Sequence, residues 1–232
     1  MIEIRKANER GRAQFPALDS RHTFSFGNYY DAEQMGWGAL RVINDDTVQP
    51  GGGFPPHGHN NMEIISYVLE GALAHKDSTG GSSVIRPGDV QIMSAGSGVV
   101  HSEFNGSEEE PVHFLQIWIE PKFTGVTPDY RERHFSSEEK RGKLRLIASP
   151  DERDGSLKIW QDAFVYSGLI DADERIDYTV ESGRRAYVHV ARGKVMLNGQ
   201  ELSGGDGVKL TGKVAVHMTD GDEAEVLIFD LP

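Results

Sequence analysis

A chain of 232 residues is long enough for one large domain or two small ones, and its composition, 38% hydrophobic and 26% charged, is that of a globular protein. The net charge of −12 disfavours direct binding to nucleic acids and to anionic membranes, because both are negatively charged themselves. The chain contains no cysteine, which excludes disulfides, thiolate metal sites and thiol nucleophiles.

Neither a secretory segment nor a membrane span is expected. The first residues, "MIEIRKANERGR", lack the apolar core of a signal peptide. Nowhere do the roughly eighteen consecutive apolar residues of a membrane-spanning helix occur. We therefore expect a cytoplasmic protein. We also expect the protein to be a monomer.

Strand patterns dominate the chain from residue 38 onward, and glycine-rich turns separate them. Segments rich in β-branched, aromatic and aliphatic residues occupy 38–44, 63–77, 82–93, 112–121, 186–199, 206–212, 213–218 and 224–232. In "RPGD" at 86–89, proline sets one backbone angle and glycine supplies freedom, so a chain reversal is predicted there. Helical pattern is limited to a short helix within 136–143. Many short strands at close spacing indicate an all-β protein, either an antiparallel barrel or a sandwich.

The chain also repeats itself weakly. A Gly-Asp turn precedes a histidine by nearly the same spacing in both halves, from Gly88 to His101 and from Gly205 to His217. Two related β-barrels joined by the polar stretch 121–155 would explain this repeat. The alternative is that β-proteins share glycine turns by chance.

Two pairs of potential metal ligands are spaced for strands. His57 and His59 are two residues apart, as are His101 and Glu103, and residues at i and i+2 of a strand point to one face. Pro55 and Pro56 favour an extended backbone just before the first pair. On neighbouring strands the two pairs would direct four ligands at one ion. Taken singly, each histidine is better interpreted as a surface or core residue, and it is the two spaced pairs that indicate a metal site.

Three imidazoles and one carboxylate form a site suited to one divalent transition metal, namely Fe(II), Mn, Co, Ni, Cu or Zn. Four ligands from one side leave adjacent positions of an octahedral ion open. Open positions distinguish a site that binds substrate from a structural one.

At this point the sequence resembles a known family. The segment from Gly51 to Glu63 follows the first cupin motif, and the segment from Gly88 through His101 to Asn105 follows the second, without its usual proline. More specifically, the chain is similar to the pirins, and closest to the bacterial pirin-like proteins. The stretches that carry this resemblance are "HTFSFGNYYD" (22–31), "ALRVINDD" (39–46), "QIMSAGSGVVHSE" (91–103) and "DGSLKIWQD" (154–162).

The resemblance implies a bicupin, that is, two antiparallel jelly-roll barrels with few short helices. We expect an N-terminal metal-binding barrel at 1–135 and a metal-free C-terminal barrel at 136–232. The family's ligands fall on His57, His59, His101 and Glu103, and the family's metal is usually iron, so Fe(II) is the expected ion. In the second barrel, Thr179 stands where the repeat would place His57.

Three further residues are candidates for the site. Glu63 shares strand parity with His57 and His59, and this glutamate binds metal in most cupins. The pirin resemblance assigns the carboxylate ligand to Glu103 instead, which leaves Glu63 to orient a histidine through a hydrogen bond. Phe24 and Phe26 alternate as on a strand and are expected either in the core or in the wall of a substrate pocket.

The resemblance implies quercetin 2,3-dioxygenase activity, that is, cleavage of a flavonol by O₂ with release of carbon monoxide. Glu103 is the expected base for the substrate's hydroxyl proton. A second hypothesis is a non-enzymatic metal-bound redox sensor or regulatory cofactor protein that acts through protein partners. A third is an enzyme whose natural substrate is not a flavonol.

Overall fold

The computed structural model describes all 232 residues, and the chain divides into two compact units. The N-terminal unit comprises Arg10–His134 and Leu157–Gln161, and the C-terminal unit comprises Met1–Glu9, Phe135–Ser156 and Asp162–Pro232. Strands make up 60% of the chain and helices 4%, which confirms the all-β prediction. None of the helices has the length and apolar character that crossing a membrane requires.

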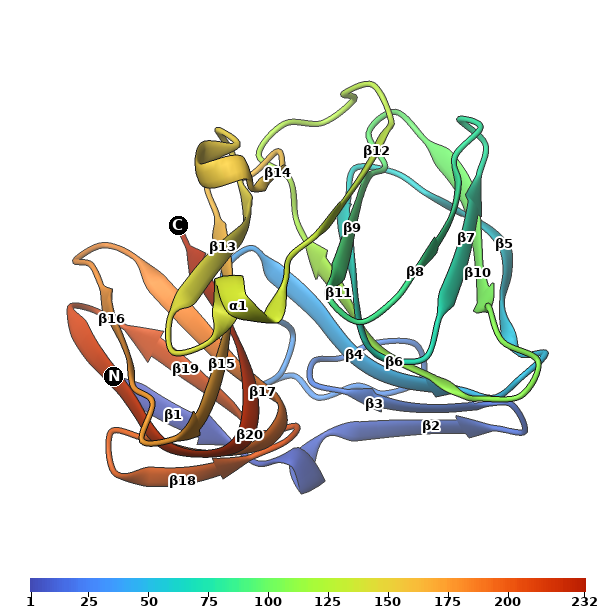
Figure 1. The fold of residues 1–232 in the computed structure, drawn as a ribbon. Helices are drawn as coiled ribbons and strands as arrows, with labels where there is room; N and C mark the ends of the chain where they lie inside the picture. The colour runs from blue at the N-terminus through green and yellow to red at the C-terminus, as the bar shows by residue number, and fades with distance from the viewer. The chain divides into compact units, whose positions relative to one another are not determined.

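Two antiparallel sheets build the N-terminal unit, and Figure 1 shows them curling around one another. One sheet has the order β12-β9-β6-β11-β4-β3-β2 and the other the order β5-β10-β7-β8. The strands of these two sheets are β2 (Gly11–Phe15), β3 (Leu18–His22), β4 (Leu40–Val48), β5 (Gly53–His59), β6 (Glu63–Glu70), β7 (Leu73–Asp77), β8 (Ser82–Ile85), β9 (Asp89–Ser94), β10 (Val99–Asn105), β11 (Val112–Ile119) and β12 (Asp129–His134). The unit also includes the two-residue strand β14 (Leu157–Lys158), which belongs to neither sheet.

Local sequence explains where these strands turn. At "RPGD" the amide of Asp89 donates to the carbonyl of Arg86 at 2.9 Å, and Gly88 has a φ of +94°, so the predicted chain reversal is confirmed. The predicted strand 63–77 is broken into β6 and β7 at Gly71. There φ is +76°, and a Cβ atom would lie 2.4 Å from the carbonyl oxygen of Pro111.

Buried apolar side chains fill the interior of the N-terminal unit. One cluster comprises Val48, Val68, Leu73, Ile85, Val112 and Phe114. A second cluster comprises Ile64, Met93, Ala95 and Val99, and Trp118 packs against it. The apolar interior holds the strands in register, so the polar side chains that interrupt it occupy defined positions.

The C-terminal unit consists of antiparallel strands around one large apolar core, which includes Ile170, Val188, Val208, Val226 and Ile228. A capping box at Ser136 and Glu139 starts its short helix, within the predicted range 136–143. The elements of this unit are β1 (Ile2–Arg5), η1 (Ala7–Glu9), α1 (Ser137–Lys140), β13 (Leu144–Ser149), η2 (Arg153–Gly155), β15 (Phe164–Ala172), β16 (Ile176–Val180), β17 (Arg185–Leu197), β18 (Gln200–Ser203), β19 (Gly207–Thr211) and β20 (Val214–Leu231).

The first strand of the chain belongs to the C-terminal unit. β1 pairs with β19, so that Ile2 lies opposite Leu210 and Arg5 opposite Gly207, as the adjacent blue and red strands in Figure 1 show. The expected division at residue 135 places Met1–Glu9 in the first barrel instead. Short polar segments carry no local signal for their pairing partner, because pairing depends on which sheet edge is open.

Candidate metal centre

The two predicted ligand pairs lie on neighbouring strands, β5 and β10. These strands pair antiparallel, and His57 lies directly opposite His101. β5 is an edge strand of its sheet, where prolines such as Pro55 and Pro56 are tolerated because no ladder hydrogen bond is required of them on the open side. Strand pairing thus joins segments more than forty residues apart and meets the condition under which the two ligand pairs can converge.

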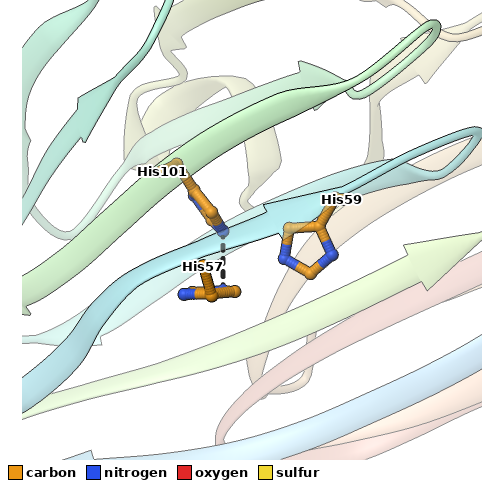
Figure 2. Close-up of side chains that lie close together, drawn as sticks. All are labelled: His57, His59 and His101. Carbon is orange, nitrogen blue, oxygen red and sulfur yellow. Dashed lines mark hydrogen bonds between the residues drawn. The ribbon is translucent and has the colours of Figure 1, made fainter.

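Figure 2 shows the imidazole rings of His57, His59 and His101 converging. The ring centroids lie 4.8 Å apart for His57 and His59, 4.5 Å for His57 and His101, and 4.9 Å for His59 and His101. The Nε2 atoms of His57 and His101 approach to 3.0 Å. One ligand nitrogen from each ring lies within 4.8 Å of the others, which is close enough for a single ion to bind all three.

The protonation of these rings suits metal binding. The Nδ1 atom of His57 lies 2.7 Å from the carbonyl oxygen of Pro55, which can only accept, so Nδ1 donates and Nε2 presents a lone pair. Burial, followed by the repulsion that a protonated His57 would exert, lowers the pKa of His59 to about 4. Burial, followed by the charges of the neighbouring histidines, lowers the pKa of His101 to about 3. Neutral imidazoles facing one another are the donor set that a divalent transition metal requires.

The carboxyl group of Glu103 is fully buried beside His101. A change of register between His101 and Glu103 sets His101 opposite His57 but Glu103 opposite Phe54 on β5. Glu103, His101 and His75 form a second group whose ligand atoms lie within 4.8 Å of one another. The hydroxyl of Ser66 donates to Glu103 at 2.9 Å, and the amide of Gln116 donates at 2.6 Å. Glu103 therefore belongs to the same locality as the histidine triad and is held in place by two donors.

Burial raises the pKa of Glu103 to about 7, despite the opposing effect of the hydrogen bonds from Ser66 and Gln116. In the metal-free protein the carboxyl group is therefore partly protonated near neutral pH. A group in this condition can both accept and release a proton near neutral pH.

This raised pKa predicts how the stability of the metal-free protein depends on pH. Because the folded-state pKa (about 7) exceeds the ordinary value of 4.5, the folded state binds the proton more tightly. The stabilisation is fully present below pH 4.5 and is lost as the pH rises to about 7, by up to ~3 kcal/mol. Relative to the wild type, Glu103→Gln should therefore gain stability between these pH values, as urea unfolding of the metal-free proteins would show. The exposed-site control Glu109→Gln should follow the wild type, and identical curves for all three proteins would contradict the prediction.

Glu63 lies apart from both groups of ligand atoms. Its carboxyl group accepts hydrogen bonds from the Ser94 hydroxyl at 2.8 Å and from the backbone amide of Trp160 at 3.2 Å. Both contacts connect β6 to residues of the same unit rather than to the histidines. In the sequence, Glu63 was a rival ligand because it shares strand parity with His57 and His59. That spacing does not reveal that its carboxyl group is bound by Ser94 and Trp160.

His75 on β7 also lies beside the site, in the second group of ligand atoms. Its ring lies 2.8 Å from Asp77 through Nε2 and 3.3 Å from the amide of Gln91 through Nδ1. The ring also stacks on Tyr130 and lies 5.5 Å from the His101 ring. Ser66, Gln116 and His75 were not predicted as neighbours of the site. Ser66 and Gln116 each stand alone in an apolar strand pattern, and His75 has no second histidine two residues away.

A cavity of about 480 Å³ opens beside the triad. Its wall includes His57, His59 and Glu103, together with the apolar side chains of Phe26, Phe54 and Trp118. Trp118 contacts both His59 and Phe26 with ring centroids 5.1 and 5.3 Å apart. Phe24, the other phenylalanine of "HTFSF", is only 1% exposed and is not part of the wall. Of the two alternatives expected for these phenylalanines, Phe26 lies in the cavity wall and Phe24 lies in the core.

Comparisons with known proteins agree with this fold. The family model described as Pirin matches residues 3–119, and the model described as Quercetinase C-terminal cupin domain matches residues 146–231. "Quercetin 2,3-dioxygenase" of Escherichia coli is 47% identical over 232 residues, covering 100% of this chain and 99% of that protein. "Pirin-like protein" of Caulobacter vibrioides is 40% identical and covers 99% of each.

Solved structures of bacterial pirins are similar to this chain over its whole length. The crystal structure of YhhW from Escherichia coli has a TM-score of 0.95 and 46% identity, covering 100% of this chain and 98% of that one. A structure described as bacterial pirin YhhW in complex with nickel(II) has a TM-score of 0.94 and 46% identity, covering 100% and 99%.

Two cupin domains, one of which carries a histidine triad beside a cavity, define the class of this protein as a bicupin. Within that class, the chain belongs to the pirin family. It is a full-length homologue of quercetin 2,3-dioxygenase.

Proposed function

We propose that this protein is a metal-dependent dioxygenase that cleaves a flavonol such as quercetin with O₂ and releases carbon monoxide. The observation that carries the proposal is the convergence of His57, His59 and His101 beside buried Glu103 on the wall of a cavity. The identity to quercetin 2,3-dioxygenase along the whole chain supports the same reaction.

In this proposal His57, His59, His101 and Glu103 hold one ion per chain, Fe(II) being the expected metal. Such an ion, when bound, lowers the pKa of a hydroxyl group attached to it and brings the substrate and O₂ together. The donor set equally suits Mn, Co, Ni, Cu and Zn. Metal analysis of the purified protein distinguishes them, and a content near two ions per chain would contradict the proposed stoichiometry.

The protein's own residues supply binding, orientation and proton transfer. Phe26, Phe54 and Trp118 offer apolar surface to a flat aromatic ring and reduce the access of water. A carboxylate oxygen of Glu103 takes the proton of the flavonol 3-hydroxyl, and the resulting electron-rich flavonolate reacts with O₂ to give a depside and carbon monoxide. Ser66 and Gln116 hold the Glu103 carboxyl group in a fixed orientation during this transfer.

The proposal is tested by loading the metal-free protein with each candidate metal and adding quercetin without oxygen. We expect the flavonol absorption band to shift to longer wavelength, because the 3-hydroxyl and 4-carbonyl oxygens chelate the ion. Admitting oxygen should then consume O₂ and release carbon monoxide in equal amounts. His217→Gln in the C-terminal unit should behave as the wild type. A band shift without turnover in every metal form would contradict the proposal and favour a metal-dependent sensor.

A further inference from the structure

Four polar side chains form a row along one wall of the cavity. Ser20 and His22 lie on β3, Asn44 and Asp46 on β4, and the strands pair so that His22 faces Asn44 and Ser20 faces Asp46. All four line the cavity, and none is more than 4% exposed. We call these residues the polar row. They are separate in the sequence from both metal-ligand pairs.

Three atoms of the polar row have no hydrogen-bond partner, although they are buried. They are Nδ1 of His22, Oδ1 of Asn44 and Oδ1 of Asp46. A buried polar atom without a partner costs about 1–3 kcal/mol, so native proteins seldom keep several together without a reason. The residues that carry these atoms line the cavity, so a ligand bound there is a candidate for the missing hydrogen-bond partner.

Nδ1 of His22 and Oδ1 of Asn44 are hydrogen-bond acceptors, whereas burial raises the pKa of Asp46 to about 7, so its carboxyl group accepts when ionised and can also donate when protonated. Burial lowers the pKa of His22, so the ring is neutral at pH 7, and its one proton is used in a hydrogen bond with the backbone of Phe26. The unpartnered Nδ1 atom is therefore a lone pair. The amide oxygen of Asn44 accepts only, and Ser20 hydrogen-bonds to the Asp46 carboxyl group while its Oδ1 remains unpartnered. Two acceptors and one carboxyl group call for a ligand that carries hydroxyl groups, which can donate to all three residues and can also accept from a protonated Asp46.

The other walls of the cavity restrict that ligand further. Phe26, Tyr29, Phe54 and Trp118 are aromatic and suit a flat ring system. A flat aromatic ligand that carries several hydrogen-bond donors is a polyphenol. Aliphatic polyols would leave the aromatic surface poorly covered, and an unsubstituted aromatic would leave the acceptors unpaired.

We propose that the polar row binds phenolic hydroxyl groups of the substrate outside its metal-chelating oxygen pair, and thereby selects polyhydroxylated flavonols over unsubstituted 3-hydroxyflavone. This inference rests on the proposed function for the identity of the ring system. It goes further by assigning substrate selection to His22, Asn44 and Asp46. The hydroxyl of each such group donates to an acceptor of the row.

The test measures dissociation constants of quercetin and 3-hydroxyflavone for the nickel-loaded protein under anaerobic conditions. Both ligands share the chelating 3-hydroxyl and 4-carbonyl groups, but 3-hydroxyflavone lacks the remaining hydroxyls. The wild type should bind quercetin at least about tenfold more tightly, since buried acceptors discriminate strongly against a ligand without donors. Asn44→Leu, which keeps the size and removes the acceptor, should reduce this ratio about tenfold and leave the affinity for 3-hydroxyflavone unchanged or increased.

A second variant of the polar row and a control variant ensure that the result does not depend on Asn44→Leu alone. His22→Phe retains a ring beside Phe26 and removes Nδ1, so it should also reduce the ratio. Thr47→Val on β4 does not line the cavity and should keep the wild-type ratio. Circular dichroism and metal content establish that each variant is folded and loaded.

A wild type that binds both flavonols equally would overturn the inference, and so would variants that weaken both ligands by the same factor. Either result leaves the dioxygenase proposal standing if turnover occurs. Conversely, a protein that discriminates between the ligands but never consumes O₂ contradicts the dioxygenase proposal alone.

Discussion

Replacing His101 by alanine is expected to remove most of the bound metal and to reduce flavonol turnover to background. Its ring lies at the centre of the site, since it belongs both to the triad with His57 and His59 and to the group with His75 and Glu103. Loss of a residue that merely supports a ligand typically costs about 10–100-fold in metal affinity, so loss of a ligand should cost about 100-fold or more. Elemental analysis after dialysis and O₂ uptake measure the two effects.

The fold should survive this substitution. The strands around the site are held by apolar clusters rather than by an ion, unlike a domain that folds only with its metal. His113→Ala is the matched control, because His113 is a histidine of the same unit that pairs with Asp45 at 2.6 Å outside the cavity wall. The control should retain metal and turnover. A His101→Ala protein with full metal content would contradict the ligand assignment.

Glu103→Gln is expected to keep much of the metal and to lose most of the turnover. The amide oxygen can still coordinate an ion and can still accept one of the two hydrogen bonds that Ser66 and Gln116 donate to the carboxylate, but it cannot take up the substrate proton. A positioned general base contributes about 10²–10⁴-fold, so turnover should fall within that range. Quercetin should still bind without oxygen, as the absorption shift would report.

The Ser66→Ala variant tests whether Glu103 acts as the base or only supports the structure of the site. Its hydroxyl lowers the pKa of Glu103 by donating to the carboxylate, so its removal should raise that pKa further. The acidic limb of the kcat/KM profile should then move to higher pH, because the base form appears later in the titration. An undiminished rate in Glu103→Gln would exclude Glu103 as the base and direct attention to another buried carboxyl group of the cavity, Asp46.

Much of the fold and site follows from the local sequence. Segments rich in β-branched and aromatic residues between glycine turns give the all-β class, and the Pro-Gly pair gives the turn before β9. The i and i+2 spacing places His57 with His59 on one side of β5. These features depend only on backbone geometry within a few residues. The motif from Gly51 to Glu63 indicated a cupin, and the pirin-like segments indicated the pirin family.

Tertiary structure decided the rest, because it brings together residues that no local pattern connects. The change of register between His101 and Glu103, the burial of Glu103 between Ser66 and Gln116, and the hydrogen bonds of Glu63 to Ser94 and Trp160 all depend on neighbouring strands. The pairing of β1 with β19 and the alignment of His22 with Asn44 likewise arise from long-range register. A strand's own residues define its two faces, whereas only its partners determine what each face meets and how strongly burial shifts a buried group's pKa.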